Sequence, residues 1–354
     1  MGIDCCQEEG LLTINKSLNN NNITDIKDED LHESYPKDGK FVKKSILGKG
    51  AYGEVRKIVS TKSNRTYALK ETSLNSFKNV KSFIRENEIL SKCNHPNIID
   101  FKEIFKDMNT ETINMILEYA KGGTLEQQIK GEKYIEEKTL IFWLMQVCLG
   151  LSYLHKKLII HRDIKPENIF LTEKDLIKIG DLGLAKIFKS KDDLKRKNTV
   201  AGTGYYMAPE MINSKQYTEK VDIYSLGKTF KRFLSKNNYS EEFTQLVNSL
   251  MENDPNKRLS ADEILNTPII KRGMKSFLED NNYENSLSKK IMKNIEINKK
   301  NYIKEDGIDC FIKDIKKERK NLTNKDYYEN DNKENSEDLD LIMCIISKII
   351  KEKK

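Results

Sequence analysis

Apolar and polar residues alternate in two different ways along this chain. From residue 41 to residue 119, short β-prone runs are separated by Gly, Ser and Asn, which predicts a meander of strands. One helical repeat interrupts the strands at about Val80 to Cys93. The expected strands are Phe41-Val42, Ile46-Leu47, Val55 to Val59, Tyr67 to Leu69, Ile98 to Phe105 and Ile113 to Tyr119.

After Gly122-Gly123 the pattern becomes helical. Thr139 to His155 places its apolar residues on one broad face, which predicts a buried core helix. Further helical segments follow at Val221 to Leu234 and at Glu241 to Glu252, and the pattern ends near Pro268. The chain is therefore expected to have an α+β, bilobal fold, with a small β-rich lobe that carries one helix and a larger α-helical lobe.

The two ends differ from this middle part. Residues 1–40 carry nine acidic and four basic side chains with little apolar periodicity, so we expect a disordered acidic segment. Residues 271–354 are rich in Lys, Asn and Glu, and they close with an amphipathic helix at Leu339 to Ile350. The predicted domains are thus 1–40, 41–270 and 271–354.

Charge and cysteine usage narrow the functional classes. The net charge of +7 comes from a basic excess in residues 41–270, but no zinc-finger, helix-turn-helix or RNA-reading motif accompanies it, so no nucleic-acid partner is expected. No apolar run approaches the roughly 20 residues that span a bilayer, and no secretory signal is present. The six cysteines show no C-x-x-C spacing, so we expect a cytoplasmic, reducing location.

The stretch His161-Arg-Asp-Ile-Lys-Pro-Glu-Asn168 places a carboxylate (Asp163), a cation (Lys165) and a carboxamide (Asn168) in one short loop. Phosphoryl transfer needs such groups for the acceptor hydroxyl, the γ-phosphate and the metal ion. The spacing matches the H-R-D-x-x-x-x-N catalytic loop of protein kinases. The loop therefore indicates phosphoryl transfer if its usual partners follow in order.

The partners are present on both sides of this loop. Gly48-Lys-Gly50-Ala-Tyr-Gly53-Glu-Val55 lies between β-prone runs, and glycines there let the backbone approach phosphates. Lys70 ends Tyr67-Ala-Leu-Lys70, which resembles the V-A-I-K strand whose lysine grips the α- and β-phosphates. Its carboxylate partner is Glu86 or Glu88, which point to nearly opposite sides of a helix, and kinase spacing selects Glu86.

Two further motifs and two supporting residues complete the order. Asp181-Leu-Gly183 resembles the D-F-G metal loop, and Gly202 to Glu210 resembles the end of a kinase activation loop. Asp222 and Arg258 match two supporting residues. Over residues 41–270 the chain therefore resembles a eukaryotic protein kinase, which implies that Asp222 braces the catalytic loop and that Arg258 pairs with Glu210.

The type of kinase is indicated by residues around the site. Lys165 and Thr203 are those that serine/threonine kinases carry. Asn168 to Leu171, Ile179 to Lys186 and Glu118 to Gly123 look most like the NIMA-related (NEK) kinases, although kinases of the eIF2α group share some of these residues. The resemblance implies ATP and Mg²⁺ as cofactors and protein substrates with Ser or Thr acceptors.

The resemblance also assigns roles. Asp163 would orient the acceptor hydroxyl and take its proton, Lys165 would stabilise the transferring phosphoryl group, and Asn168 and Asp181 would bind Mg²⁺. Ala68 would lie above adenine and Phe170 below it, with Leu117 as the gatekeeper. The residues expected to contact or position the nucleotide are Leu47, Gly48, Lys49, Gly50, Ala51, Tyr52, Gly53, Glu54, Val55, Ala68, Lys70, Glu86, Leu117, Glu118, Ala120 and Phe170.

Regulation is implied as well. Arg162 beside Asp163 is the arrangement of kinases that are switched by a phosphate on the activation loop, which an upstream kinase can supply. Thr199, three residues before Gly202, is the expected phosphate site, and Thr203 belongs to the same regulated segment. Two departures stand out. Gly204 occupies a position where proline is usual, and only eleven residues separate Gly227 from Tyr239, where the family normally fits a substrate-docking helix.

The N-terminus, Met1-Gly-Ile-Asp-Cys-Cys6, is nearly a myristoylation pattern, with Cys6 where Ser or Thr is preferred. One acyl chain binds membranes only marginally, so Cys5 or Cys6 would have to carry a second. Acylation at Gly2, Cys5 and Cys6 would give peripheral membrane association; an unmodified disordered start is the other reading. The alternative function is a membrane-anchored pseudokinase scaffold, for which Lys70, Asp163, Asn168 or Asp181 should be lost, and all four are present.

Overall fold

A computed structural model gives the fold. The described residues form two compact units, one that runs up to Lys92 and includes Asp100–Tyr119, and one made of Cys93–Ile99 and the residues from Ala120 on. Among the described residues no helix is long and apolar enough to cross a bilayer. The structure describes residues 32–33, 41–50, 53–75, 77–107, 110–131, 133–173, 175–190, 193, 200–213 and 216–280.

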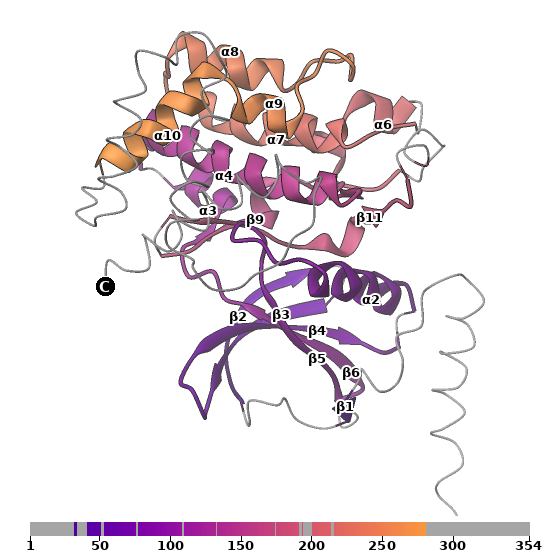
Figure 1. The fold of residues 1–354 in the computed structure, drawn as a ribbon. Helices are drawn as coiled ribbons and strands as arrows, with labels where there is room; N and C mark the ends of the chain where they lie inside the picture. The colour runs from indigo at the N-terminus through magenta and orange to yellow at the C-terminus, as the bar shows by residue number, and fades with distance from the viewer. Residues whose placement is uncertain are drawn as a thin grey trace, which may run out of the picture. The chain divides into compact units, whose positions relative to one another are not determined.

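The first unit is a twisted sheet with one helix packed against it, drawn in indigo and purple in Figure 1. Its strand order is β1-β5-β6-β4-β3-β2, and all neighbours are antiparallel except β1, which runs parallel to β5. Helix α2 contacts β4 and β5, and it buries Phe83 and Ile89. The elements are β1 (His32–Glu33), β2 (Phe41–Gly50), β3 (Gly53–Ser60), β4 (Thr66–Ser73), α2 (Phe77–Ser91), β5 (Phe101–Asp107) and β6 (Thr112–Glu118).

The expected meander is therefore present, with three differences. Phe41-Val42 and Ile46-Leu47, expected as separate strands, belong to one strand, β2. The sequence pattern did not predict β1, which lies in the segment expected to be disordered, because two residues pairing with Phe105 and Lys106 leave no periodicity to read. The run from Ile98 to Phe105, expected as one strand, is divided. Ile98 and Ile99 are buried in the second unit, where Ile99 N–H donates to the Ile179 carbonyl at 2.9 Å, and β5 begins only at Phe101.

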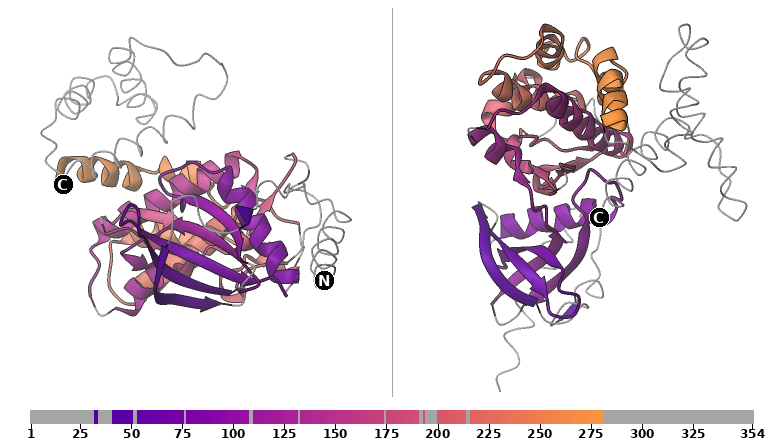
Figure 2. Two further views of the ribbon diagram at one scale, coloured as in Figure 1. Left: turned by 90° about the horizontal axis from the view of Figure 1, so that it is seen from below. Right: turned by 90° about the vertical axis from the view of Figure 1, so that its left-hand side faces the viewer.

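The second unit is built around α4, a helix of twenty residues (Glu137–Lys156) that is buried along most of its length. It contacts α9 and α10 and the strands β8 and β10, and α7 packs on α8; Figure 2 shows this helical layer from two further sides. The other helices are α3 (Leu125–Lys130), α6 (Pro209–Asn213), α7 (Lys220–Leu234), α8 (Glu241–Ser249), α9 (Ala261–Leu265) and α10 (Pro268–Asp280).

The loops of this unit include short paired strands and 3₁₀ turns. A three-stranded sheet has the order β10-β9-β7, and β11 pairs with β8. Three of the helices start with side-chain caps: Thr124 and Ser260 form capping boxes for α3 and α9, and Ser240 caps α8. The elements are β7 (Gly123–Thr124), β8 (Ile159–Ile160), β9 (Ile169–Leu171), β10 (Ile177–Ile179), β11 (Lys186–Ile187), and the 3₁₀ turns η2 (Pro166–Asn168), η3 (Leu182–Leu184) and η4 (Gly204–Tyr206).

The connection between α7 and α8 is short, as the sequence indicated, and it is held by polar contacts. Ser240 donates through its backbone N–H and its hydroxyl to the carboxylate of Glu137 at the start of α4. The Tyr239 hydroxyl donates to the Ile135 carbonyl at 3.0 Å, and its ring stacks on Tyr134. The shortened segment is therefore tied directly to the turn before α4.

Candidate active site

The glycine-rich stretch forms a tight hairpin in the first unit. Strands β2 and β3 pair up to Gly50 and Gly53, and Ala51 and Tyr52 lie outside the described residues. Gly53 has a φ of +136°, and a Cβ on it would stand 1.9 Å from the carbonyl oxygen of Glu71. Only a residue without a side chain fits both constraints, so this glycine is required by the hairpin.

The rest of the stretch lies on the two strands. Gly48 pairs with Val55 and Lys49 with Glu54, whose carboxylate is 3.2 Å from the Lys49 ammonium. Leu47, just before the hairpin, is 43% exposed. The backbone amides expected to face phosphates are thus carried on a paired ribbon.

Lys70 and Glu86 form an ion pair inside the first unit. Lys70 stands on β4, and its Nζ lies 2.6 Å from Oε2 of Glu86 on α2. The side chains are only 12% and 2% exposed. Glu88, the other carboxylate considered, pairs instead with Lys92 one turn along the helix at the surface. Because burying an unpaired charge is costly, this pair fixes the lysine against the sheet.

The residues expected around adenine belong to both units. In the first, Ala68 on β4 lies opposite Leu117 on β6, and Glu118 follows at the end of that strand. The Glu118 N–H donates to the Asp100 carbonyl at 2.9 Å, so this N–H already has a partner within the first unit. In the second, Ala120 is buried and Phe170 lies half-buried on β9.

The catalytic loop of the second unit gathers the predicted reactive groups around Asp163. The side-chain Nδ2 of Asn168 donates to Oδ2 of Asp163 at 3.0 Å and to the main-chain carbonyl of Asp163 at 2.8 Å. Nζ of Lys165 lies 2.7 Å from the same Oδ2. The Thr203 hydroxyl donates to Oδ1 at 2.7 Å and accepts from Lys165 at 2.8 Å. Asp163 is therefore a buried carboxylate that already accepts a hydrogen bond from an alcohol.

Asp222 on α7 holds the backbone at the start of this loop. Its buried carboxylate accepts from the backbone N–H groups of His161 and Arg162 at 2.9 and 2.8 Å, and from Nε2 of His155 at 2.9 Å. Burial alone would raise the pKa of the Asp222 carboxyl, but the hydrogen bond from His155 and the neighbouring His161 keep this pKa below its usual value. The carboxylate stays charged and fixes the backbone just before Asp163.

The two predicted metal ligands are joined through the backbone. The Gly180 N–H donates to the Asn168 carbonyl at 3.0 Å, and the Gly180 carbonyl accepts from Nε2 of His161 at 3.0 Å. Asp181 follows at once, in the left-handed conformation with a φ of +56°. The side-chain Nδ2 of Asn168 donates to Asp163, so the side-chain oxygen of Asn168 is the atom that can bind a cation. Together with the Asp181 carboxylate this is a hard oxygen donor set, which fits Mg²⁺ completed by phosphate and water.

Comparison with known proteins agrees with this geometry. The model of the protein kinase domain matches residues 41–241. The chain belongs to the protein kinase family. It is similar to three mouse (Mus musculus) serine/threonine-protein kinases: Nek4 (30% identity, covering 66% of this chain), Nek3 (37%, 51%) and Nek9 (35%, 64%). These relatives confirm the resemblance to the NEK kinases.

The chain spans about a third of the length of these curated relatives, since the match covers 33% of Nek4, 35% of Nek3 and 26% of Nek9. The similarity therefore describes a kinase domain rather than their whole length.

In the kinase domain, Arg162 connects three segments. Its backbone is left-handed, with a φ of +66°, and Gly202 packs so closely that a Cβ on it would be 2.4 Å from the Arg162 carbonyl. The guanidinium donates from Nε to the Leu184 carbonyl at 2.7 Å and from Nη1 to the Tyr217 hydroxyl at 3.2 Å. The arginine thus links the catalytic loop to the metal loop and to the chain after α6.

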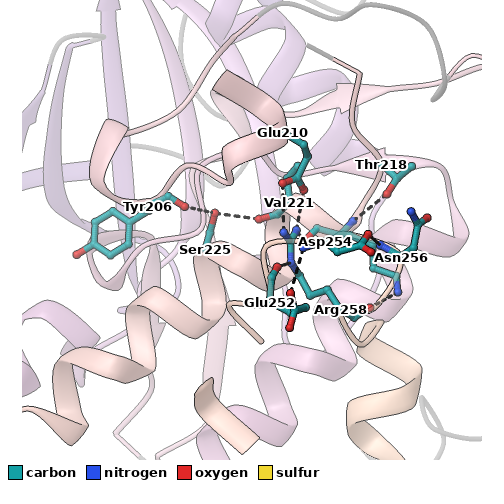
Figure 3. A network of polar contacts seen from close by, with 10 residues as sticks. Tyr206, Glu210, Thr218, Val221, Ser225, Glu252, Asp254, Asn256 and Arg258 are labelled. Carbon is teal, nitrogen blue, oxygen red and sulfur yellow. Dashed lines mark hydrogen bonds and ion pairs between the residues drawn. The ribbon is translucent and has the colours of Figure 1, made fainter. Parts of the chain in front are cut away.

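Arg258 and Glu210 form another buried ion pair (Figure 3). Nη1 and Nη2 of Arg258 contact the two carboxylate oxygens of Glu210 at 2.6 and 3.2 Å. The arginine also donates to the carbonyls of Glu252 and Lys220, both at 2.8 Å, and it is fully buried. These contacts tie the end of the activation segment to α7 and to the turn before α9.

Sequence reasoning missed a buried polar residue that positions the loops. Gln146 is buried on α4, where its Oε1 accepts from the Asn97 side chain at 3.1 Å and from the Ile177 N–H at 2.9 Å. The Asn97 carbonyl in turn accepts from the Ile179 N–H at 2.8 Å. The signal for Gln146 is a single amide in the otherwise apolar run of residues 140–151 of this helix. It holds the strand β10 that leads to Asp181.

Several predicted residues cannot be placed. Thr199 and the acylation candidates Gly2, Cys5 and Cys6 lie outside the described residues, as does the expected helix at Leu339 to Ile350. Those assignments remain predictions.

Proposed function

We propose that this chain is a serine/threonine protein kinase that transfers the γ-phosphoryl group of Mg-ATP to Ser and Thr hydroxyls of protein substrates. The observation that carries the proposal is the buried Asp163 carboxylate, which is held by Asn168 and Lys165 of the same loop and by Thr203 of the activation segment. The family match and the serine/threonine-protein kinases among its relatives support it.

The chemistry follows from these contacts. Oδ1 of Asp163 already accepts a hydrogen bond from the Thr203 alcohol at 2.7 Å, so it is suited to orient an acceptor hydroxyl and to take its proton. The new P–O bond would form to the acceptor oxygen while the bond from the γ-phosphorus to the bridging oxygen breaks and ADP leaves. Lys165, within 2.7 Å of the same carboxylate, puts a positive charge where negative charge develops on the phosphoryl oxygens. Orientation and electrostatics are the main demands of phosphoryl transfer, and the loop supplies both.

The nucleotide would be held by separate groups. The Lys70 ammonium, fixed by Glu86, would bind phosphate oxygens, and the Gly48–Gly53 ribbon would present backbone N–H groups to them. Asn168 and Asp181 would hold Mg²⁺, which when bound neutralises phosphate charge. The backbone just before Asp181 is held by the hydrogen bond from the Gly180 N–H to the Asn168 carbonyl.

The test is a transfer assay on a library of peptides that contains Ser, Thr and Tyr acceptors, with Mg-ATP labelled at the γ-phosphate. We expect incorporation into Ser and Thr peptides by the wild type and only background incorporation by Asp163→Ala. Equal signals from the two proteins would refute catalysis by this site and would leave the pseudokinase scaffold as the better description. The preferred peptides would also give the sequence preference.

We further propose that phosphorylation of Thr199 switches the activity. Arg162 already contacts the metal-loop end and Tyr217, so a phosphate beside it would add charge-assisted hydrogen bonds to an arginine that is in place. Thr199→Ala is expected to lose at least about tenfold in kcat, because one such bond contributes roughly 1.5–3 kcal/mol. Thr199→Ser, which can still be phosphorylated, is the matched control, and full activity in Thr199→Ala would contradict the switch.

A third proposal concerns location. With a fatty acid on Gly2 and a second on Cys5 or Cys6, the protein would associate with membranes as a peripheral protein. The Gly2→Ala protein is then expected to move from the membrane fraction to the soluble fraction, with Lys16→Ala as a control nearby. A Gly2→Ala protein that stays in the membrane fraction as well as the wild type would end this proposal.

A further inference from the structure

The turn that follows Thr203 begins with a glycine that has open space around it. Gly204 begins η4, and a Cβ placed on it would meet no atom within 4 Å, so no close neighbour requires a glycine there. Glycine loses more conformational entropy than any other residue when its backbone is fixed. Yet Thr203, the residue before it, must stay in place, since its hydroxyl bridges Asp163 and Lys165.

The other end of the turn is fixed from three directions. The Tyr206 N–H donates to the Thr203 carbonyl at 2.9 Å. The Tyr206 carbonyl accepts from the Ser225 hydroxyl at 2.8 Å, and Figure 3 shows this second contact. The Tyr206 hydroxyl accepts from Nη1 of Arg232 on α7 at 2.9 Å. Tyr206 is therefore buried and anchored through both its backbone and its side chain.

Arg232 is itself held by Glu126 at the start of α3. Nη1 and Nη2 each contact one oxygen of the Glu126 carboxylate, Nη2 at 3.2 Å, which is the two-pronged geometry that orients a guanidinium best. Arg232 is 27% exposed and Glu126 12% exposed. The hydrogen bond from Arg232 keeps the pKa of Glu126 below its usual value, so the pair stays charged at neutral pH.

These contacts meet beside the catalytic loop. Helix α3 packs next to η2, which ends in Asn168, and α7 packs next to η4. The chain Glu126–Arg232–Tyr206 thus ends on the turn whose first neighbour, Thr203, touches the catalytic carboxylate. Of these three contacting residues, only Tyr206 lies in a motif identified from the sequence.

We propose that Glu126 and Arg232 form a clamp that fixes the Gly204–Tyr206 turn through the Tyr206 hydroxyl, and that this clamp positions Thr203 and the acceptor peptide for transfer. The inference rests on the proposed kinase activity. Arg232 and Glu126 are positioning residues, because they act through Tyr206. A proline at position 204 would restrict the backbone of this turn directly. In this protein the clamp restricts the same turn through the Tyr206 side chain.

That substitution can be made. Thr203 has φ −94° and ψ 116°, which is the extended conformation that a residue before proline adopts. Gly204 is the first residue of a helical turn, where proline is tolerated, and the space around it is open. Gly204→Pro should therefore fit, and it should make Arg232 less important.

The experiment compares Arg232→Met, Tyr206→Phe, Gly204→Pro and the double variant Gly204→Pro/Arg232→Met. Arg232→Met and Tyr206→Phe are each expected to raise the KM for peptide about tenfold while the KM for ATP stays within about twofold. The double variant should recover most of the loss. Arg272→Met, which breaks an exposed ion pair with Glu242, is the matched control and should match the wild type.

Hydrogen exchange gives a second measurement that needs no activity. The Tyr206 and Met207 amides donate to the Thr203 and Gly204 carbonyls, so they report on the turn directly. Arg232→Met should speed their exchange about tenfold, and Gly204→Pro should restore it. Wild-type peptide KM and exchange in Tyr206→Phe would overturn the clamp, as would a double variant no better than Arg232→Met. If neither the wild type nor any variant transfers phosphate, the proposed function fails. The hydrogen exchange of the Tyr206 and Met207 amides would still show whether the clamp fixes the turn.

Discussion

Replacing Asp163 by asparagine is expected to lower kcat for peptide phosphorylation by about 10²- to 10⁴-fold, the usual contribution of a positioned acid–base group. The change keeps the size of the side chain but removes its charge and its ability to take a proton. It also puts an N–H₂ group among Lys165, Thr203 and the Asn168 amide, all of which donate to this carboxylate. Lost catalysis and lost orientation then act together.

The measurement is steady-state kinetics with a peptide from the library, together with ATP binding by calorimetry. Because Lys70 and Glu86 are untouched, Asp163→Asn should still bind the nucleotide. Glu88→Gln is the matched control, since it makes the same chemical change in an exposed i,i+4 pair worth only about 0.3–0.5 kcal/mol. An Asp163→Asn protein with the kcat of the wild type would rule out the assigned role.

The second large effect is on stability. Arg258→Met is expected to lower the free energy of unfolding by about 3–5 kcal/mol, because it leaves the Glu210 carboxylate without its buried partner. In a domain of this size the melting temperature should then fall by about 10 °C. Two backbone carbonyls, of Glu252 and Lys220, lose a donor in the same step.

The pair can be separated from its surroundings by a double substitution. Arg258→Met/Glu210→Met removes both charges, so it should be more stable than Arg258→Met alone, although the two carbonyls stay unpaired. Arg272→Met makes the same change at the surface, where the pair with Glu242 is more than half exposed, and should cost less than about 1 kcal/mol. Equal melting temperatures for Arg258→Met and Arg272→Met would contradict the role given to the buried pair.

Much of the fold could be predicted because its signals are local. Alternating runs predicted β2 to β6, and an apolar face predicted α4 within two residues at its start. The site was predictable for a different reason. Lys70, Asp163 and Asp181 each sit in a short motif whose order along the chain is itself informative, so distant pieces could be assigned without knowing how they meet.

What could not be predicted depends on pairs far apart in sequence. Arg232 contacts Glu126 across 106 positions and Tyr206 across 26, and neither contact leaves a periodic pattern. The same holds for Ile98 and Ile99, which look like the beginning of a strand but are buried against Ile179. Local hydrophobicity reports that a residue is buried, and it does not report against which partner.

Helix α10 bears on how the kinase domain can be produced as a fragment. The family model ends at residue 241 and the sequence pattern at about 270, but α10 runs from Pro268 to Asp280 and buries Ile270 and Met274 against the rest of the unit. Gly273 lies so close to α4 that a Cβ on it would be 2.5 Å from a methyl group of Ile141. A fragment cut at 241 or 270 would uncover this side of the central helix and would tend to aggregate, so an expression boundary belongs after Asp280.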